Sequence, residues 1–503
     1  MERLAVIDMG SNSWRLVVYG YDPGTPWWSL TDEIREAVRV GEGMGEENEL
    51  QPGPMDRAVH TAAVFAAFCK ASGVEDVRAL ATSAIRDARN REELLNQIKE
   101  RTSLDVRVIS GEDEARYGYL AIANSTTLED GAGIELGGGS LQLTRMVGRR
   151  LEESASLPLG SVRMSERFLP EEKASGKQMK ALRAHVTEEL EGCDWWEGER
   201  LAGIGGTIRN LAAAAQKRVD FPDVDVGGFE LTREALEDLV EELASKPASK
   251  RGDIKGIKPD RADVILGGSL VVAAAMDCGD FDALEVSEAG LREGVFFEHA
   301  LDGDPPLFDD VRRQSVKNLA HRFNTNPEHV QHVGKLSLEI FDGLAVAGLH
   351  DLGDEERELL WAACVLHDIG TAIDYDDHHR HSYYLILHAG LPGYTPRELV
   401  LIGLIARYHR KGDPDASDLA DLERKGDKQR LEVLCGVIRL AEQLERSRDQ
   451  SVAAVEIDVN DGRVRLAPKA DGRGGDTSVA IWSARRNADL LADAIGKEVE
   501  VAG

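Results

Sequence analysis

Two glycine-rich turns, each at the end of an apolar segment, constrain the fold of this chain most strongly. One lies in IDMGSNSWRLVVY, which starts at Ile7, and the other in IELGGGSLQL, which starts at Ile134, 127 residues further along. Each apolar segment carries an acid, Asp8 or Glu135, two residues before the first glycine of its turn. A strand, a glycine turn and a second strand, used twice in this way, favour two related α/β halves that face a cleft.

The region before residue 302 alternates short β-branched segments with helical ones, which is typical of α/β proteins. We expect strands at residues 4–7, 15–18, 106–109 and 142–147. The sequence DGDPP at 302–306 interrupts this alternation and predicts a domain boundary, because glycine and proline break regular structure.

The rest of the chain predicts a helical domain and a small tail. After the boundary, apolar residues are spaced by three and four, and ten of the 13 histidines lie between His321 and His409. From Val452, VAAVEIDVNDGRVRLAP alternates like two strands joined by an Asn-Asp-Gly turn, and SARRNADLLADAIG at 483–496 follows as one helix. We therefore expect a small α+β tail domain.

The net charge of the chain limits the classes of partner that it can bind. Lys and Arg number 60 against 90 Asp and Glu, which gives a formal charge of −30 and repels nucleic acids and anionic membranes. No apolar run reaches the roughly 20 residues of a membrane helix. Asp8 falls where a secretory signal needs its apolar stretch, so we expect a cytoplasmic protein. Any polyanionic substrate must be held in a locally basic or amide-lined pocket.

The glycine turns are suited to binding phosphate. In the first, backbone N–H groups and small polar side chains can surround phosphate oxygens, and the three glycines of the second let backbone amides approach a ligand. A third turn, from Gly203 to Thr207, precedes a helix whose N-terminus adds the positive end of a dipole. An ordinary strand connection is the alternative for each turn. The expected phosphate-binding residues are Ser11, Asn12, Ser13, Gly137, Gly138, Gly139, Ser140, Gly205, Gly206 and Thr207.

Eight motifs along the chain are shared, in order, with a known family. They are IDMGSNSWRLVV, ATSAIRDARN (81–90), ISGEDEARYGYLAI (109–122), IELGGGSLQL, SLPLGSVRMSERF (156–168), GIGGTIRNLA, KPDRADVILGG (258–268) and VSEAGLREGVFFE (286–298). On these motifs the chain resembles the exopolyphosphatase / guanosine pentaphosphate phosphohydrolase family, Ppx/GppA. The resemblance continues into the helical region and the tail, so it covers essentially the whole chain.

The resemblance implies a fold and a domain division. The family belongs to the actin-like ATPase and sugar-kinase superfamily, so we expect an α/β fold with two actin-like, ribonuclease H-like domains flanking a cleft. An all-α HD-like domain and the small α+β tail domain follow. The expected domains span 1–123, 124–303, 304–450 and 451–503, and a homodimer is expected from the family alone.

The resemblance also implies roles for individual residues. Glu114 in SGEDEAR occupies the family's general-base position, and Arg86 corresponds to its phosphate-contacting arginine. Asp8 and Glu135 suit Mg²⁺, with Mn²⁺ as an alternative, because hard oxygen ligands suit a hard cation. The structural alternatives are a solvated helix-start carboxylate for Glu114, turn-capping carboxylates for Asp8 and Glu135, and a surface ion pair for Arg86.

The second turn departs from the family pattern, which usually reads Asp-Ile-Gly-Gly-Gly-Ser-Thr-Glu. In this chain Glu135, Leu141 and Gln142 stand in place of the Asp, the Thr and the final Glu. Gln142 removes a carboxylate from the metal or water shell. Glu135 is longer than Asp by one methylene and can reach toward the ion.

A basic segment between Lys246 and Arg261 stands out against the acidic chain, with six cations and two acids. The family that the chain resembles must bind a polyanion, so this segment predicts a polyphosphate track. A solvated face is the alternative. The track residues expected are Lys250, Arg251, Lys255, Lys258 and Arg261.

The histidine-rich region has the residue order of an HD-type phosphohydrolase domain, in which histidines and aspartates from several helices converge on metal. The candidate metal ligands are His329, His367 and Asp368, followed by further histidines up to His409. Glu442 stands where an HD site has its final Asp. A structural or polymer-binding domain without catalytic metal is the alternative.

Together these features predict an exopolyphosphatase that hydrolyses the terminal phosphate of inorganic polyphosphate with a Glu-activated water and Mg²⁺. Three alternatives stay open. They are a guanosine pentaphosphate 5′-phosphohydrolase, a metal-dependent HD phosphohydrolase with a sensory N-terminal half, and a non-catalytic polyphosphate- or alarmone-binding protein.

Overall fold

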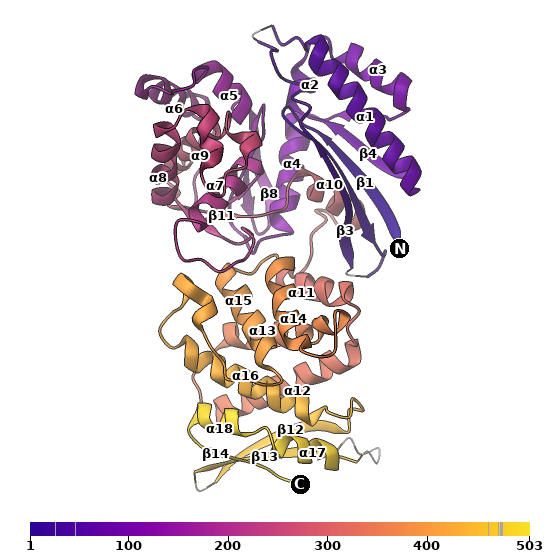
Figure 1. Ribbon diagram of the computed structural model, residues 1–503, viewed down its shortest axis with the longest axis vertical. Coiled ribbons are helices and arrows are strands. Elements are labelled where there is room, and N and C mark those ends of the chain that lie inside the picture. Colours follow the sequence, from indigo (N-terminus) through magenta and orange to yellow (C-terminus); the bar gives the residue numbers. More distant parts are fainter. Residues whose placement is uncertain (26, 46, 461, 471, 473–475) are drawn as a thin grey trace. The chain divides into compact units, whose positions relative to one another are not determined.

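The chain forms two compact units (Figure 1). The computed structural model describes all of residues 1–503 except 26, 46, 461, 471 and 473–475. Unit 1 comprises Met1–Val219 and Val226–Val311, and unit 2 comprises Asp220–Asp225 and Arg312–Gly503. The finer division into four domains stays a prediction.

The first sheet of unit 1 has five strands in the order β3-β2-β1-β4-β5. Its strands are β1 (Glu2–Met9), β2 (Trp14–Tyr21), β3 (Trp28–Glu36), β4 (Asp76–Ala81) and β5 (Val106–Val108). Side chains of β1 alternate between two cores, because successive residues of a strand point to opposite faces. Ile7 packs in the core with helices α1 (Pro52–Ser72) and α3 (Arg91–Thr102), and Val6 packs in the core with α4 (Gly111–Ala123).

The second sheet repeats this topology. Its order is β10-β11-β9-β6-β7-β8, and β6 pairs antiparallel with β7 and parallel with β9, as β1 pairs with β2 and β4. Its strands are β6 (Gly131–Leu136), β7 (Leu141–Val147), β8 (Arg150–Leu157), β9 (Leu201–Ile204), β10 (Glu230–Thr232) and β11 (Ala283–Val286). The repeated arrangement confirms the two actin-like α/β halves expected from the paired glycine turns.

Helices cover both sheets (Figure 1). The remaining helices of unit 1 are α2 (Ser83–Asp87), α5 (Ser161–Phe168), α6 (Gly176–Leu190), α7 (Gly206–Gln216), α8 (Arg233–Ser245), α9 (Ile265–Cys278), α10 (Leu291–Ala300) and the short 3-10 helices η1 (Ala248–Asp253) and η2 (Pro259–Arg261). One core joins Leu120 of α4 and Phe296 of α10 to Val6 of the first sheet and Ile204 of the second. The helix α4 therefore packs against both halves, and its first turn carries Glu114.

Unit 2 is helical and ends in a small sheet. Its elements are α11 (Val311–Arg322), α12 (Pro327–Val346), α13 (Asp354–Leu366), η3 (Ile369–Ala372), α14 (His378–Ala389), α15 (Pro396–Tyr408), η4 (Ser417–Leu422), α16 (Asp427–Leu444), β12 (Val452–Asn460), β13 (Arg463–Ala470), α17 (Ser478–Arg485), α18 (Asp489–Ile495) and β14 (Glu498–Val501). β12 and β13 pair antiparallel, as the sequence predicts. The helices and the tail share one hydrophobic core, which runs from Leu336 to Val464 and Val501.

The tail differs from the sequence-based expectation in one element. The single helix expected over 483–496 is wrong, because α17 ends at Arg485 and α18 begins at Asp489. The Asn487 side chain donates to the Ser483 carbonyl at 2.9 Å, and such local side-chain bonds compete with helix continuation. Among the described residues, no helix combines the length and the apolar character that a membrane crossing requires.

Candidate active site

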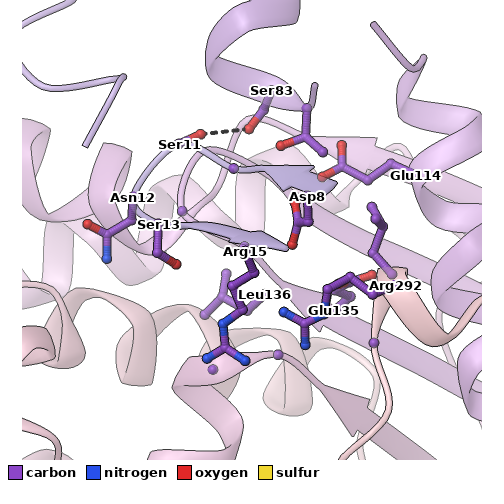
Figure 2. A pocket seen from close by; sticks show the side chains of 18 of the residues that line it. Asp8, Ser11, Asn12, Ser13, Arg15, Ser83, Glu114, Glu135, Leu136 and Arg292 are labelled. Atoms are coloured by element: carbon purple, nitrogen blue, oxygen red, sulfur yellow. Dashed lines mark hydrogen bonds between the residues drawn. The ribbon is translucent and has the colours of Figure 1, made fainter. Parts of the chain in front are cut away.

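A pocket of about 120 Å³ lies in unit 1 where the paired glycine turns meet (Figure 2). Asp8 comes from the end of β1 and Glu135 from the end of β6, so the repeated topology brings both acids to one place. Of the expected site residues, the pocket brings together Asp8, Ser11, Asn12, Ser13, Glu114, Glu135, Gly137, Gly138, Gly205, Gly206 and Arg261. Arg86, Gly139, Ser140 and Thr207 are not among its lining residues, and neither are Lys250, Arg251, Lys255 and Lys258 of the basic segment.

Three carboxylates, those of Asp8, Glu114 and Glu135, surround one space (Figure 2). Removal from water raises the pKa of each. Glu135 is affected most, because repulsion by Glu114 and Asp8 adds to burial and brings its pKa to about 8. Its buried Oε2 has no hydrogen-bond partner among the described residues. Crowded carboxylate oxygens and an unpartnered buried oxygen form a donor set that fits a hard divalent cation.

Glu114 is fixed from several sides. It lies in the first turn of α4, where the Ser110 hydroxyl accepts a hydrogen bond from the Asp113 N–H at 2.9 Å and caps the helix. Its side chain is 6 % exposed. Arg86 Nη1 donates to Glu114 Oε2 at 2.7 Å, and Ser140 Oγ donates to Oε1 at 3.4 Å. The structure thus pairs Arg86 with the expected base.

The first two glycine turns approach each other closely. Ser11 Oγ lies 3.0 Å from Ser83 Oγ, at the start of α2. A Cβ atom on Gly139 would lie 2.5 Å from Ser83 Oγ and 2.8 Å from Ser11 Oγ. Only glycine leaves room for both hydroxyls at this position.

Gln142 is buried next to Ser140 of the second glycine turn. It is the partner of Glu135 in the β6–β7 ladder and is 2 % exposed. Its Nε2 donates to Ser140 Oγ at 2.8 Å and to Ser156 Oγ at 3.2 Å. Because Ser140 in turn donates to Glu114, Gln142 supplies hydrogen-bond donors where the family pattern has an acid.

Four arginines supply the positive charge of the pocket: Arg15 from β2, Arg209 from α7, Arg261 from η2 and Arg292 from α10. Burial and mutual repulsion lower the pKa of Arg15 and of Arg261 to about 10. Such a concentration of cations is suited to holding the oxygens of a phosphate chain.

Arg209 and Arg292 lie in two of the shared motifs but were not among the expected site residues. Each arginine follows a glycine by a few residues, after Gly205-Gly206 and after Gly290. That spacing was the available signal, because a cation just beyond a glycine turn can point back toward the ligand held by the turn. Thr82 and Ser83, in the motif that also holds Arg86, line the pocket as well and were not expected.

The basic segment is only partly arranged as expected. Lys250, Lys255 and Lys258 are exposed, and Lys250 lies 3.8 Å from Asp253. Arg251 differs from the expectation of a surface track, because its side chain is only 2 % exposed. Its Nε donates to the Leu243 carbonyl at 3.0 Å, and this carbonyl also accepts from the Lys246 N–H at the end of α8.

The remaining expected residues lie elsewhere. Thr207 is fully buried in the first turn of α7, and its Oγ1 has no partner among the described residues. In unit 2, the structure brings His329, His367 and Asp368 together, with candidate ligand atoms all within 4.8 Å of one another. Their binding of a metal stays a prediction.

Comparisons with known proteins agree with this geometry. The pattern of the Ppx/GppA phosphatase family matches residues 17–302, which is more than half of the chain, and the pattern of domain III of Ppx/GppA phosphatases matches residues 311–468.

Two solved structures share the fold of unit 1. A Ppx/GppA family member from Aquifex aeolicus is 30 % identical, with a TM-score of 0.51, over 59 % of this chain and 96 % of that chain. An exopolyphosphatase from Cytophaga hutchinsonii is 24 % identical, with a TM-score of 0.55, over 59 % of this chain and 98 % of that chain. From its family patterns, its repeated sheet topology and its Aquifex relative, this chain belongs to the Ppx/GppA phosphatase family.

Proposed function

We propose that this protein is an exopolyphosphatase that hydrolyses the terminal phosphate of inorganic polyphosphate. One observation carries the proposal: the buried carboxylate of Glu114 lines a pocket together with Asp8, Glu135 and four arginines. Phosphoanhydride hydrolysis needs a group that takes a proton from water and positive charge on the transferring phosphoryl oxygens. The pocket offers both.

In this proposal Glu114 accepts the proton of a water molecule as the water oxygen attacks the terminal phosphorus. The bond from that phosphorus to the bridging oxygen breaks, and the shortened chain leaves with its negative charge. Arg292 and Arg15 are placed to balance charge on the phosphoryl oxygens. The raised pKa of Glu114 makes it a stronger base than an exposed carboxylate.

We further propose that Asp8 and Glu135 hold Mg²⁺, with Mn²⁺ as an alternative ion. The unpartnered Glu135 Oε2 and the mutual repulsion of the three carboxylates support this assignment. The ion would neutralise charge on the phosphate oxygens.

Polyphosphate is favoured over guanosine pentaphosphate by the character of the lining. No aromatic side chain is among the described residues of the pocket, so a guanine base finds no stacking surface there. Positive charge instead continues past the pocket: the pKa of Lys258 is lowered first by desolvation and then by repulsion from Arg35, Arg15 and Arg209. A continuous set of cations suits a polymer of repeated charges.

Phosphate release by the purified chain with Mg²⁺ tests the proposal, on long-chain polyphosphate and on guanosine pentaphosphate side by side. We expect release from polyphosphate that falls by about 10²- to 10⁴-fold in Glu114→Gln, the usual contribution of a general base. Glu112→Gln is the matched control, because Glu112 is exposed in the same helical turn.

Each other outcome selects an alternative. Release from the pentaphosphate alone identifies the 5′-phosphohydrolase. Tight binding without release identifies a polyphosphate- or alarmone-binding protein, and activity that survives Glu114→Gln moves the chemistry away from this pocket. A cytoplasmic location and a homodimer, the second expected from the family alone, stay part of the proposal.

A further inference from the structure

Unit 2 contains a group of buried histidine and carboxylate side chains that the proposed phosphatase chemistry does not use. Its members come from five different helices or from the residues that directly follow them: His329 from α12, His367 and Asp368 after α13, His378 from α14, His409 after α15 and Glu442 from α16. All are nearly inaccessible; His329 is 2 % exposed and His367 is 0 % exposed. Burying this many ionisable groups is unfavourable unless they are paired or bind a metal.

Three of the histidines are held in the orientation that metal ligands adopt. Nδ1 of His367 lies 2.7 Å from the Cys364 carbonyl, Nδ1 of His378 lies 2.8 Å from the Tyr375 carbonyl, and Nδ1 of His409 lies 2.6 Å from the Ala406 carbonyl. A carbonyl accepts only, so each Nδ1 carries the proton and donates it. With Nδ1 protonated, a neutral ring offers its Nε2 lone pair to a metal, and backbone carbonyls orient histidine ligands in this way.

These Nε2 atoms point at one another and at carboxylates. Nε2 of His378 lies 3.2 Å from Nε2 of His409, so two lone pairs face each other unless a cation lies between them. His367 Nε2 and Glu442 Oε2 lie 3.3 Å apart, and neither has a hydrogen-bond partner among the described residues. Cations bound between these atoms would satisfy the facing lone pairs and the unpartnered carboxylate oxygen.

Asp368 belongs to two separate ligand groups. One consists of His329, His367 and Asp368, and the other of Asp368, His378 and His409, each with its ligand atoms within 4.8 Å. We propose that unit 2 holds a two-metal centre in which Asp368 bridges the ions and Glu442 adds a ligand beside His329 and His367. Several imidazoles with two carboxylates suit Mn²⁺, Fe²⁺, Co²⁺ or Zn²⁺ better than Mg²⁺.

The surroundings of the centre indicate its ligand. A cavity of about 240 Å³ is lined by Asp368, His378, His409 and Glu442 together with Arg410, Arg446 and Arg448. Arg448 Nη2 donates to Asp368 Oδ2 at 2.7 Å, which orients the bridging carboxylate. Metal ions and arginines that line one cavity favour a doubly charged oxyanion, so we expect the site to bind a phosphate group.

Metal content tests the centre. The full-length chain is stripped with chelator, loaded with Mn²⁺ in excess Mg²⁺, which occupies hard oxygen sites, and desalted before the Mn²⁺ per chain is measured. We expect loss of both ions in Asp368→Asn and of one ion each in His329→Ala and His409→Ala. His388→Ala, an exposed histidine of α14, is the matched control and keeps both.

A second readout on the wild-type chain keeps the proposal falsifiable if a variant fails to fold. Two ions bridged by one carboxylate give an exchange-coupled Mn²⁺ electron paramagnetic resonance signal. An uncoupled signal, or equal Mn²⁺ content in wild type and folded Asp368→Asn, would overturn the two-metal centre.

Inorganic phosphate is the probe for the ligand. Bound Mn²⁺ broadens the phosphorus resonance of phosphate that sits beside it. In Arg446→Gln, with Mn²⁺ content unchanged, we expect the phosphate affinity to fall about tenfold, as for loss of one charged hydrogen bond. Unchanged broadening in Arg446→Gln and in Asp368→Asn would overturn the phosphate assignment.

Discussion

Arg86 donates a hydrogen bond to Glu114 at 2.7 Å, and this ion pair joins the α2 region to the first turn of α4. Two effects oppose each other at the Glu114 carboxylate. Burial raises its pKa, and the charge and hydrogen bond of Arg86 lower it. Arg86 therefore sets how basic Glu114 can be at neutral pH.

We expect Arg86→Met to move the acid limb of the pH–rate profile to higher pH. Without the guanidinium, the charged form of Glu114 loses its main stabilising partner, so its pKa rises and the base is protonated at a higher pH. The measurement is kcat for phosphate release from polyphosphate between pH 5 and 9. Arg89→Met, in the same motif but exposed, is the control. An acid limb that stays in place in Arg86→Met would separate Arg86 from the titration of Glu114.

The two glycine turns were the most informative part of the sequence. Because Asp8 and Glu135 stand at equivalent points of a repeated strand–turn–strand unit, the sequence alone predicted the paired sheets and the meeting of both acids. The pairing of Arg86 with Glu114, and the burial of Arg251, depend on tertiary contacts between segments far apart in the chain. Sequence spacing carries no information on such contacts.

Most arginines of the pocket were also not predicted from the sequence. Arg15, Arg209 and Arg292 come from three elements, and only folding brings them to one pocket. The basic run in the sequence pointed to Arg261, which lines the pocket, but also to Lys250 and Arg251, which do not. Local charge density in a sequence is thus a weaker guide than the position of a cation after a glycine turn.

Glu135 predicts a pH-dependent stability of the metal-free protein. Its pKa is raised from 4.5 to about 8, so the folded state binds a proton more tightly than the unfolded state does. Stability associated with this group is therefore highest below pH 4.5 and falls as the pH rises toward 8. The loss amounts to about 1.4 kcal/mol for each pKa unit, with a total of a few kcal/mol as an upper limit.

We expect Glu135→Gln, which cannot ionise, to remove this loss. In chelator, calorimetric melting should show wild type and variant close together at pH 5 and the variant more stable at pH 8.5. Addition of Mg²⁺ should reduce the difference in stability between wild type and variant at pH 8.5, because a cation favours the ionised carboxylate. A stability difference that does not change with pH would contradict the repulsion between Glu135 and its neighbours.

Gln142 offers a test of the departure from the family pattern. Gln142→Glu would return a carboxylate to the strand position opposite Glu135 and replace an N–H donor to Ser140 by an acceptor. We expect the Mg²⁺ concentration for half-maximal phosphate release to fall, and the metal-free protein to lose stability through the added repulsion. Gln142→Met, similar in size and uncharged, is the control. An unchanged Mg²⁺ requirement in Gln142→Glu would place this position outside the influence of the ion.

Arg261 tests how the polyanion is held. Its guanidinium lies directly over Gly206, where a Cβ atom would collide with it, and its pKa is lowered to about 10 by burial and by Arg35 and Arg209. Because Arg261 comes from η2, which carries none of the three carboxylates, we expect it to bind the chain in ground and transition states alike. Arg261→Gln should then raise KM for long-chain polyphosphate by about tenfold, the effect of 1.4 kcal/mol, with kcat little changed.

Gly206→Ala should give the same pattern, since it displaces the Arg261 guanidinium without removing its charge. Lys180→Gln, an exposed cation of α6, controls for the general effect of net charge. Because attraction between charges weakens with added salt, the KM of wild type should also rise more steeply with ionic strength than the KM of Arg261→Gln. A fall in kcat with unchanged KM would instead place Arg261 at the transferring phosphoryl group, on the same footing as Arg292.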